Sequence, residues 1–152
     1  MESQLALTGK DYTLIVSDTN AAMSIIRMKN DEDKMRELSE HLVMAYNGEA
    51  GDTLQFAEYV ERNLRLYTLR HDIELQPKAA AAWVRRQLAD SLRSRHPYAV
   101  NLLLGGWDVP SEKPELYWLD YLGTLAHVPY ACHGYAGEWC TRRLSPVPAH
   151  SV

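Results

Sequence analysis

Long apolar runs, basic clusters and cysteines are all scarce in this 152-residue chain. No uninterrupted apolar stretch approaches the roughly 20 residues that a membrane-spanning helix needs, so we expect no membrane partner. The 16 Lys and Arg residues are outnumbered by 20 Asp and Glu residues, and the net charge is −4. This mild negative balance argues against nucleic acid or an anionic membrane surface as a partner. The length allows one domain with a real core and is short for two.

Cysteine is limited to Cys132 and Cys140. The first residues lack a basic segment followed by an apolar one, so we expect no secretory signal. Two cysteines without an export signal fit a reducing cytosolic or nuclear setting better than a disulfide framework. Together with His133 they supply three nearby metal-ligand candidates, whereas a structural zinc site uses four. We therefore expect buried, inert cysteines beside a surface histidine, and neither a metal nor a cofactor.

Hydrophobic periodicity predicts two helices between two groups of strands. Apolar residues recur at helical spacing over about residues 50–71 and again over 77–95, where Pro77 suits a first helical turn. The strand candidates are residues 3–9, 12–17, 41–46, 98–107, 115–123 and 126–134. The first two form an antiparallel hairpin, and 98–107 is apolar enough to be buried on both faces. Residues 18–36 are irregular, with a short strand possible around 25–26. This order favours α+β architecture with antiparallel sheets and one helix layer.

The loop that begins the first helix, G-E-A-G-D at residues 48–52, has a superficial likeness to a phosphate site. A phosphate-binding loop of that class needs the longer spacing G-x-x-x-x-G-K-[ST]. Here Asp52 stands where phosphate would sit and would repel it, while its charge suits the positive end of a helix. Gly48 and Gly51 permit the turn. We interpret the loop as structural. No G-x-S-x-G motif is present either, so the residues alone identify no active site.

Several segments in combination resemble the β-subunits of the proteasome 20S core, with the type-2 class as the nearest match. They read DYTLIVSDTNAA, GEAGDTLQFAEYVERN, RRQLADSLRSRHPYAVNLLLGGWD and LYWLDYLGTLAHVPYACHGY. The resemblance covers residues 1–135 and leaves 136–152 as a divergent tail, expected to be disordered or irregular. It implies an α/β (α+β) N-terminal-nucleophile hydrolase fold, a four-layer αββα sandwich of two antiparallel sheets. The helices and strands with which such subunits end are expected to be missing here.

Active members of this family use an N-terminal threonine, whose hydroxyl attacks and whose own amine is the base. By the resemblance, Asp18 and Lys34 match the family's aspartate and lysine. Thr8 lies inside the first predicted strand, and Ser3 could become terminal only if two residues were removed. The later oxyanion segment departs from the family, reading CHGYAGEW. The resemblance therefore implies that no residue is catalytic, and that Asp18 and Lys34 form an ion pair or a hydrogen-bonded turn.

The function that the resemblance implies is a non-catalytic structural subunit of the 20S core, in the cytoplasm and nucleus. Its partners would be the other α and β subunits of a 28-subunit hetero-oligomer that degrades proteins. Two alternatives stay open. One is a threonine- or serine-type peptidase that uses Ser3 after trimming, and the other is a truncated isoform that does not assemble. Without a second helix layer, one sheet would expose an apolar face, so we expect the isolated chain to be unstable or to aggregate.

Overall fold

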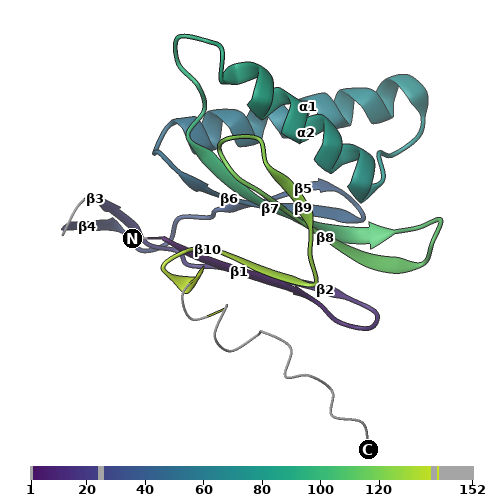
Figure 1. The fold of residues 1–152 in the computed structure, drawn as a ribbon, viewed down its shortest axis with the longest axis horizontal. Coiled ribbons are helices and arrows are strands. Elements are labelled where there is room, and N and C mark those ends of the chain that lie inside the picture. The colour runs from purple at the N-terminus through teal and green to yellow at the C-terminus, as the bar shows by residue number, and fades with distance from the viewer. Residues whose placement is uncertain (1, 24–25, 138–139, 141–152) are drawn as a thin grey trace, which may run out of the picture.

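The computed structural model describes residues 2–23, 26–137 and 140, and it shows three layers (Figure 1). Helices α1 (Asp52–His71) and α2 (Pro77–Ser91) form the first layer. A five-stranded antiparallel sheet with the order β5-β6-β7-β8-β9 forms the second, and a three-stranded sheet with the order β10-β1-β2 forms the third. A two-stranded ribbon, β3-β4, lies at one end. Across the described residues, neither helix is both long and apolar enough to cross a membrane.

The strands that the sequence predicted occur in the same order in the structure. The strands are β1 (Ser3–Thr8), β2 (Thr13–Ser17), β3 (Ala21–Met23), β4 (Ile26–Lys29), β5 (Met35–Ser39), β6 (Leu42–Gly48), β7 (Val100–Asp108), β8 (Lys113–Leu119), β9 (Leu125–His127) and β10 (Tyr130–Gly134). The hairpin of β1 and β2 is confirmed, with Leu5 opposite Val16. The tail expected to be disordered lies mostly outside the described residues, which include only 136, 137 and 140 of it.

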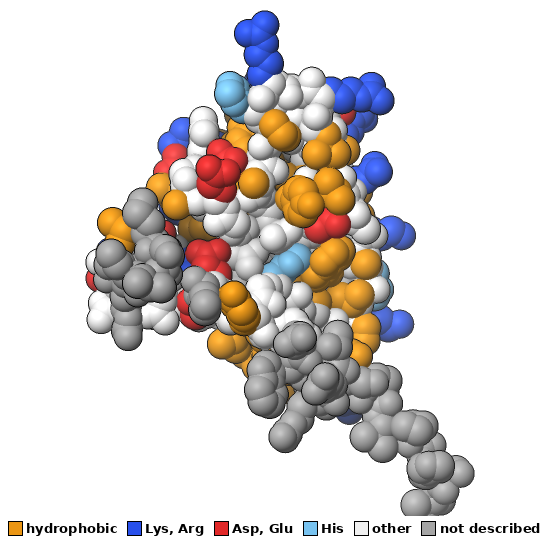
Figure 2. Space-filling model, turned by 60° about the vertical axis from the view of Figure 1, so that its left-hand side comes forward, with side chains coloured by type: hydrophobic (Ala, Val, Ile, Leu, Met, Phe, Trp, Pro, Cys, Tyr) orange, Lys and Arg blue, Asp and Glu red, His pale blue; other side chains and the backbone are white. Residues whose placement is uncertain are grey.

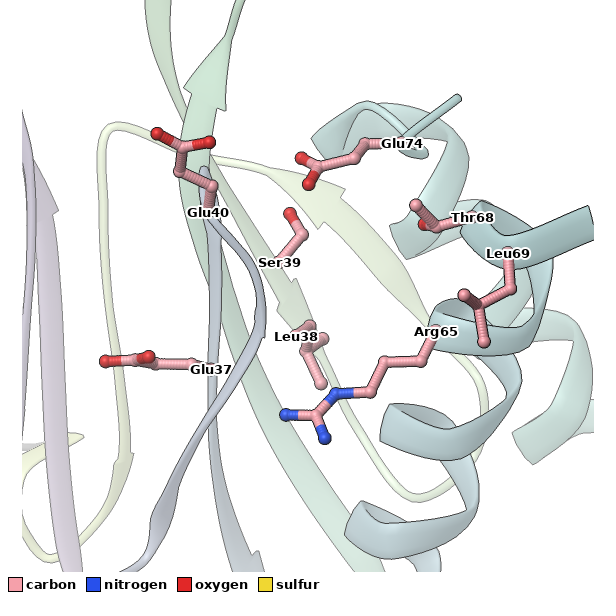
Figure 3. Close-up of a pocket in the computed structure, with 8 residues that line it drawn as sticks. All are labelled: Glu37, Leu38, Ser39, Glu40, Arg65, Thr68, Leu69 and Glu74. Atoms are coloured by element: carbon pink, nitrogen blue, oxygen red, sulfur yellow. The ribbon is translucent and has the colours of Figure 1, made fainter. Parts of the chain in front are cut away.

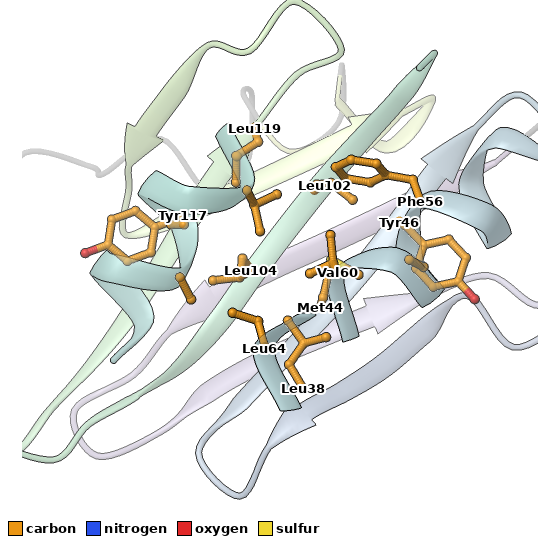
Figure 4. Close-up of a cluster of buried hydrophobic side chains, with 14 of the residues drawn as sticks. Leu38, Met44, Tyr46, Phe56, Val60, Leu64, Leu102, Leu104, Tyr117 and Leu119 are labelled. Carbon is orange, nitrogen blue, oxygen red and sulfur yellow. The ribbon is translucent and has the colours of Figure 1, made fainter. Parts of the chain in front are cut away.

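Strand β7 is the centre of the molecule, and the prediction that both its faces are buried is confirmed. Leu102 and Leu104 point towards the helices and join a cluster with Phe56 and Val60 of α1 (Figure 4). Leu103 points the other way and joins Ala6 and other residues between the two sheets. A strand rich in leucine is stable here because each leucine side chain reaches an apolar layer, whichever way it points.

Two strand predictions need correction. Irregular structure was predicted for residues 18–36, with a short strand possible around 25–26, but this range contains β3, β4 and the start of β5. Only Leu38 of β5 is fully buried, so the periodic signal of this strand is weak. Residues 126–134 do not form one strand. Strand β9 pairs with β8 in the larger sheet, whereas β10 pairs with β1 in the smaller one. Pro129 separates them, because proline cannot donate a ladder hydrogen bond, and the chain changes sheets at that point.

The three-stranded sheet has an apolar outer face, as the sequence predicted. Its inner residues, such as Gln4 and Ala6, are fully buried, whereas the outward-facing Leu14 and Val16 of β2 are 44% and 48% exposed. Strand β2 is also the edge of its sheet in the described part of the chain. An edge strand with exposed apolar side chains is a template for association with another chain.

We therefore expect Leu14→Lys combined with Val16→Lys to reduce aggregation of the isolated chain on heating. Static light scattering at matched protein concentration measures this. The stability of the monomer should change by no more than about 0.5 kcal/mol per site, because both side chains are exposed. Gln55→Lys on α1, at an exposed polar residue, adds a charge to the helix layer without removing an apolar side chain and serves as the control. Equal aggregation of the double variant and the parent would contradict the role of this face.

Candidate functional site

The loop from Gly48 to Asp52 joins strand β6 to helix α1, as the sequence predicted. Gly48 has φ +143°, and a Cβ atom there would collide with the carbonyl oxygen of Ala99. The Asp52 carboxylate accepts a hydrogen bond from the Ala99 amide at 3.2 Å. Asp52, which was expected to repel phosphate, therefore fixes the start of α1 to the residue just before β7.

Lys34 is the most buried cation of the described chain, with a side chain only 3% exposed. Its ammonium group contacts the Asp18 carboxylate at 3.2 Å, the Glu2 carboxylate at 3.1 Å and the Asn20 carbonyl oxygen at 2.8 Å. A lysine ammonium has three donors, and these three acceptors match them. The predicted ion pair of Asp18 and Lys34 is thus confirmed.

The fold brings these groups together because antiparallel pairing places the start of one strand beside the end of the next. Glu2 precedes β1 and Asp18 follows β2, while Lys34 precedes β5 and Gly48 ends β6. Glu2 and Asp18 flank strands of the three-stranded sheet, and Lys34 and Gly48 belong to the side of the five-stranded sheet. Both pairs lie at the same end of the sandwich. The cluster therefore joins the two sheets across their interface.

Glu2 uses both of its carboxylate oxygens in this cluster. Oε1 contacts Lys34, and Oε2 accepts a hydrogen bond from the Gly48 amide at 3.1 Å. The carboxylate thus occupies the position between the Lys34 ammonium and the Gly48 amide. Among the described residues, the hydrogen-bond and ion-pair partners of Lys34 are two carboxylates and one carbonyl oxygen, with no hydroxyl or thiol group.

The two hydroxyl residues singled out in the sequence lie elsewhere. The Ser3 amide donates to the Asp18 carboxylate at 3.1 Å, and the Ser3 carbonyl accepts from the Asp18 amide at 3.1 Å. Side chains alternate along a strand, so Ser3 points to the opposite face from Gln4, which is buried between the sheets. Thr8 ends β1, and its hydroxyl donates to the Pro129 carbonyl at 3.0 Å.

Comparison with known proteins gives the same assignment as the motifs. Residues 2–144 match the family model described as "Proteasome subunit". This chain belongs to the proteasome β-subunit family. A probable β type-4 subunit of Schizosaccharomyces pombe is 53% identical over 140 residues, which is 92% of this chain and 72% of the relative. The Saccharomyces cerevisiae β type-4 subunit is 47% identical over 137 residues, 90% of this chain and 69% of the relative. A Dictyostelium discoideum β type-2 subunit is 44% identical over 138 residues, 90% of this chain and 69% of the relative.

Within this proteasome-family fold, the residue that the sequence interpretation missed is Glu2. Strand alternation could have indicated it, because Glu2 shares its parity with the buried residues Gln4 and Ala6. The family resemblance indicated Ser3 instead, because the nucleophile of active members is a hydroxyl group. Only the fold identifies Glu2 as a site residue, because it brings β1, β5 and β6 together at this end of the sandwich.

The predictions for the cysteines and their histidine were wrong. Cys132 and Cys140 form a disulfide, with Cα atoms 6.4 Å apart, within the usual range for this bond. His133 is buried rather than on the surface, because β10 turns it inwards between the sheets. Its ring stacks on Trp118 with centroids 5.1 Å apart, and Nε2 lies 3.1 Å from the Leu102 carbonyl oxygen. No group of three or more metal-ligating side chains is found in the described ranges.

Because His133 is buried, it makes the stability of the folded state sensitive to acid pH. Desolvation lowers its pKa below the usual 6.5, although the Leu102 and Leu119 carbonyls and the Asp120 charge oppose that shift. The folded state therefore binds fewer protons than the unfolded state below about pH 6.5, so this contribution to stability is complete above that pH and declines as the pH falls towards the folded-state pKa.

We expect the parent chain to lose more stability than His133→Gln when the pH falls from about 7.5 to about 5.5. Glutamine keeps a donor for Leu102 and does not titrate, and the other histidines are common to both proteins. Urea unfolding at each pH measures the difference. Parallel stability curves for the two proteins would show that His133 does not titrate on unfolding.

A surface groove of about 420 Å³ lies between strand β5 and the last turns of α1 (Figure 3). Its hydroxyl groups are already used locally: Thr68 donates to the Leu64 carbonyl at 3.2 Å, and Ser39 accepts from the His41 amide at 3.4 Å. Arg65 is paired with Glu61 at 2.9 Å. The groove therefore offers no activated nucleophile and differs from the cluster around Lys34.

Proposed function

We propose that this chain is a non-catalytic, structural β-subunit of the proteasome 20S core. The observation that carries the proposal is the Glu2 carboxylate, bonded to both Lys34 and Gly48. Hydrolysis by this class of enzyme needs a hydroxyl and a base within hydrogen-bond reach of each other. A carboxylate paired with lysine supplies neither the hydroxyl nor a free amine.

Assembly with other α and β subunits into the 28-subunit core is the second part of the proposal. Exposed apolar side chains on two separate layers support it. Leu14 and Val16 lie on the outer sheet, and Leu69 and Ile73 lie at the end of the helix layer, 83% and 64% exposed. Figure 2 shows hydrophobic side chains reaching the surface between charged groups on one face of the molecule. Such side chains are stabilised when a large, shape-specific interface covers them.

The experiment that tests the proposal purifies 20S particles through an affinity tag on this chain, expressed with the remaining core subunits. The chain is expected to co-purify at the size of the assembled core. The particles are then treated with a peptide epoxyketone, which labels a terminal hydroxyl and amine together. We expect the active β-subunits in the same particles to be labelled and this chain to remain unlabelled.

Each alternative has its own outcome in this experiment. A labelled Ser3, with two residues lost by intact mass, would establish a peptidase and contradict the non-catalytic role. Failure to co-purify would identify a non-assembling isoform. The proposal also places the chain in the cytoplasm and nucleus, and fractionation of tagged cells should recover it from both compartments.

A further inference from the structure

The Glu2 carboxylate is held as a bound ligand would be held. Each oxygen meets one donor, and the donors come from different strands: the Lys34 ammonium lies just before β5, and the Gly48 amide ends β6. Both distances are 3.1 Å. A planar group with two equivalent oxygens fits two donors arranged in this way.

The two donors are positioned by contacts that do not involve Glu2. Lys34 is held by Asp18 at 3.2 Å and by the Asn20 carbonyl at 2.8 Å. Gly48 is paired with Val100 in the sheet, and the next amide, that of Glu49, donates to Ala99 at 3.0 Å. The donors should therefore remain in place when residue 2 changes.

Glu2 itself is the more exposed partner. It precedes β1, and its side chain is 31% exposed, against 3% for Lys34. Removing its carboxylate leaves Lys34 balanced by Asp18 alone and leaves the Gly48 amide without this acceptor. One incoming negative charge restores the original balance, whereas the nearby Asp18 opposes a second charge. This favours a monocarboxylate over a dianion such as phosphate.

We propose that Lys34 and Gly48 form a carboxylate-binding site that Glu2 fills from within the chain, and that a carboxylate of another molecule binds there when it displaces Glu2. A free small carboxylate and the C-terminal carboxylate of a peptide share this chemistry. The proposal goes beyond the proposed function, and it does not depend on assembly into a larger particle.

The test opens the site with Glu2→Ala and adds acetate at constant ionic strength. The Gly48 amide resonance reports binding directly, and the melting temperature reports the gain in stability. We expect a saturable shift of the Gly48 amide and a rise in melting temperature for Glu2→Ala. Binding to the parent should be weaker by about tenfold or more, because Glu2 competes through two charge-assisted hydrogen bonds.

The controls separate binding from a general salt effect. Glu40→Ala removes an exposed carboxylate of the same type and should show no saturable shift at Gly48. Acetamide has the shape of acetate without its charge and should not bind. A response to acetate equal in Glu2→Ala and Glu40→Ala, or no response in either, would overturn the proposal.

A peptide with a free C-terminus and its C-terminal amide distinguish the two sources of the carboxylate. Binding of the free peptide and not of the amide supports a peptide terminus as the ligand. Binding of acetate alone supports a small free carboxylate. If Glu2→Ala does not fold, Glu2→Gln keeps the side-chain size but has only one acceptor oxygen. Its Gly48 amide should still respond to acetate more strongly than that of Glu40→Gln, and an equal response would count against the site.

Discussion

Lys34→Met is expected to lower the free energy of unfolding by about 2–4 kcal/mol, because it leaves two carboxylates facing each other with no cation between them. Glu2 and Asp18 would lose their shared partner at a position where their side chains are only 31% and 20% exposed. Breaking a fully buried pair costs about 3–5 kcal/mol, and the partial exposure of the acids reduces that figure. Urea unfolding at neutral pH measures the change.

Lys29→Met is the matched control for that prediction. Lys29 also pairs with a carboxylate, Asp31 at 3.6 Å, but the two side chains are 57% and 76% exposed. Its loss should change stability by no more than about 0.5 kcal/mol, because water screens such a pair. Similar effects of the two substitutions would show that the Lys34 cluster does not join the sheets energetically. Asp18→Leu in the Lys34→Met background should recover part of the loss, since one unpaired charge is removed.

Phe56→Ala is expected to cost about 3–5 kcal/mol, the largest effect of a single substitution in the helix layer. Phe56 is fully buried in α1, with its ring 4.9 Å from that of Tyr98 and its side chain in the cluster with Leu102 (Figure 4). Alanine removes the transfer energy of the ring and leaves a cavity that the rigid sheet below cannot fill. The helix would then be held less firmly to β7.

The same helix provides the control, since Leu54 lies two residues before Phe56, on a different face of α1, and is 48% exposed. Leu54→Ala should cost less than about 1 kcal/mol, because alanine is also the better helix former. Chemical unfolding followed by circular dichroism gives both values under a two-state analysis. A Phe56→Ala protein as stable as Leu54→Ala would mean that the helix layer is not coupled to the sheet.

Local patterns were sufficient for most elements of the fold. The hairpin of β1 and β2, the two helices and the doubly buried β7 each carry a strong period, of two or of 3.6 residues, or an unbroken apolar run. The helix-entry loop was also predictable, because glycine and aspartate suit that turn for local reasons. The pairing of Asp18 with Lys34 came from a resemblance, and the structure confirms it at 3.2 Å.

The sequence by itself determined the two helices, the β1–β2 hairpin and the doubly buried β7, and that this chain is a proteasome-type β-subunit. The tertiary structure decided which strands share a sheet, that Glu2 reaches Lys34 and Gly48, that Cys132 meets Cys140, and that His133 is buried. The physical reason is how far apart in the sequence the interacting residues lie. Secondary structure depends on side chains a few residues apart, whereas these contacts exist only after strands from both ends of the chain are brought into register.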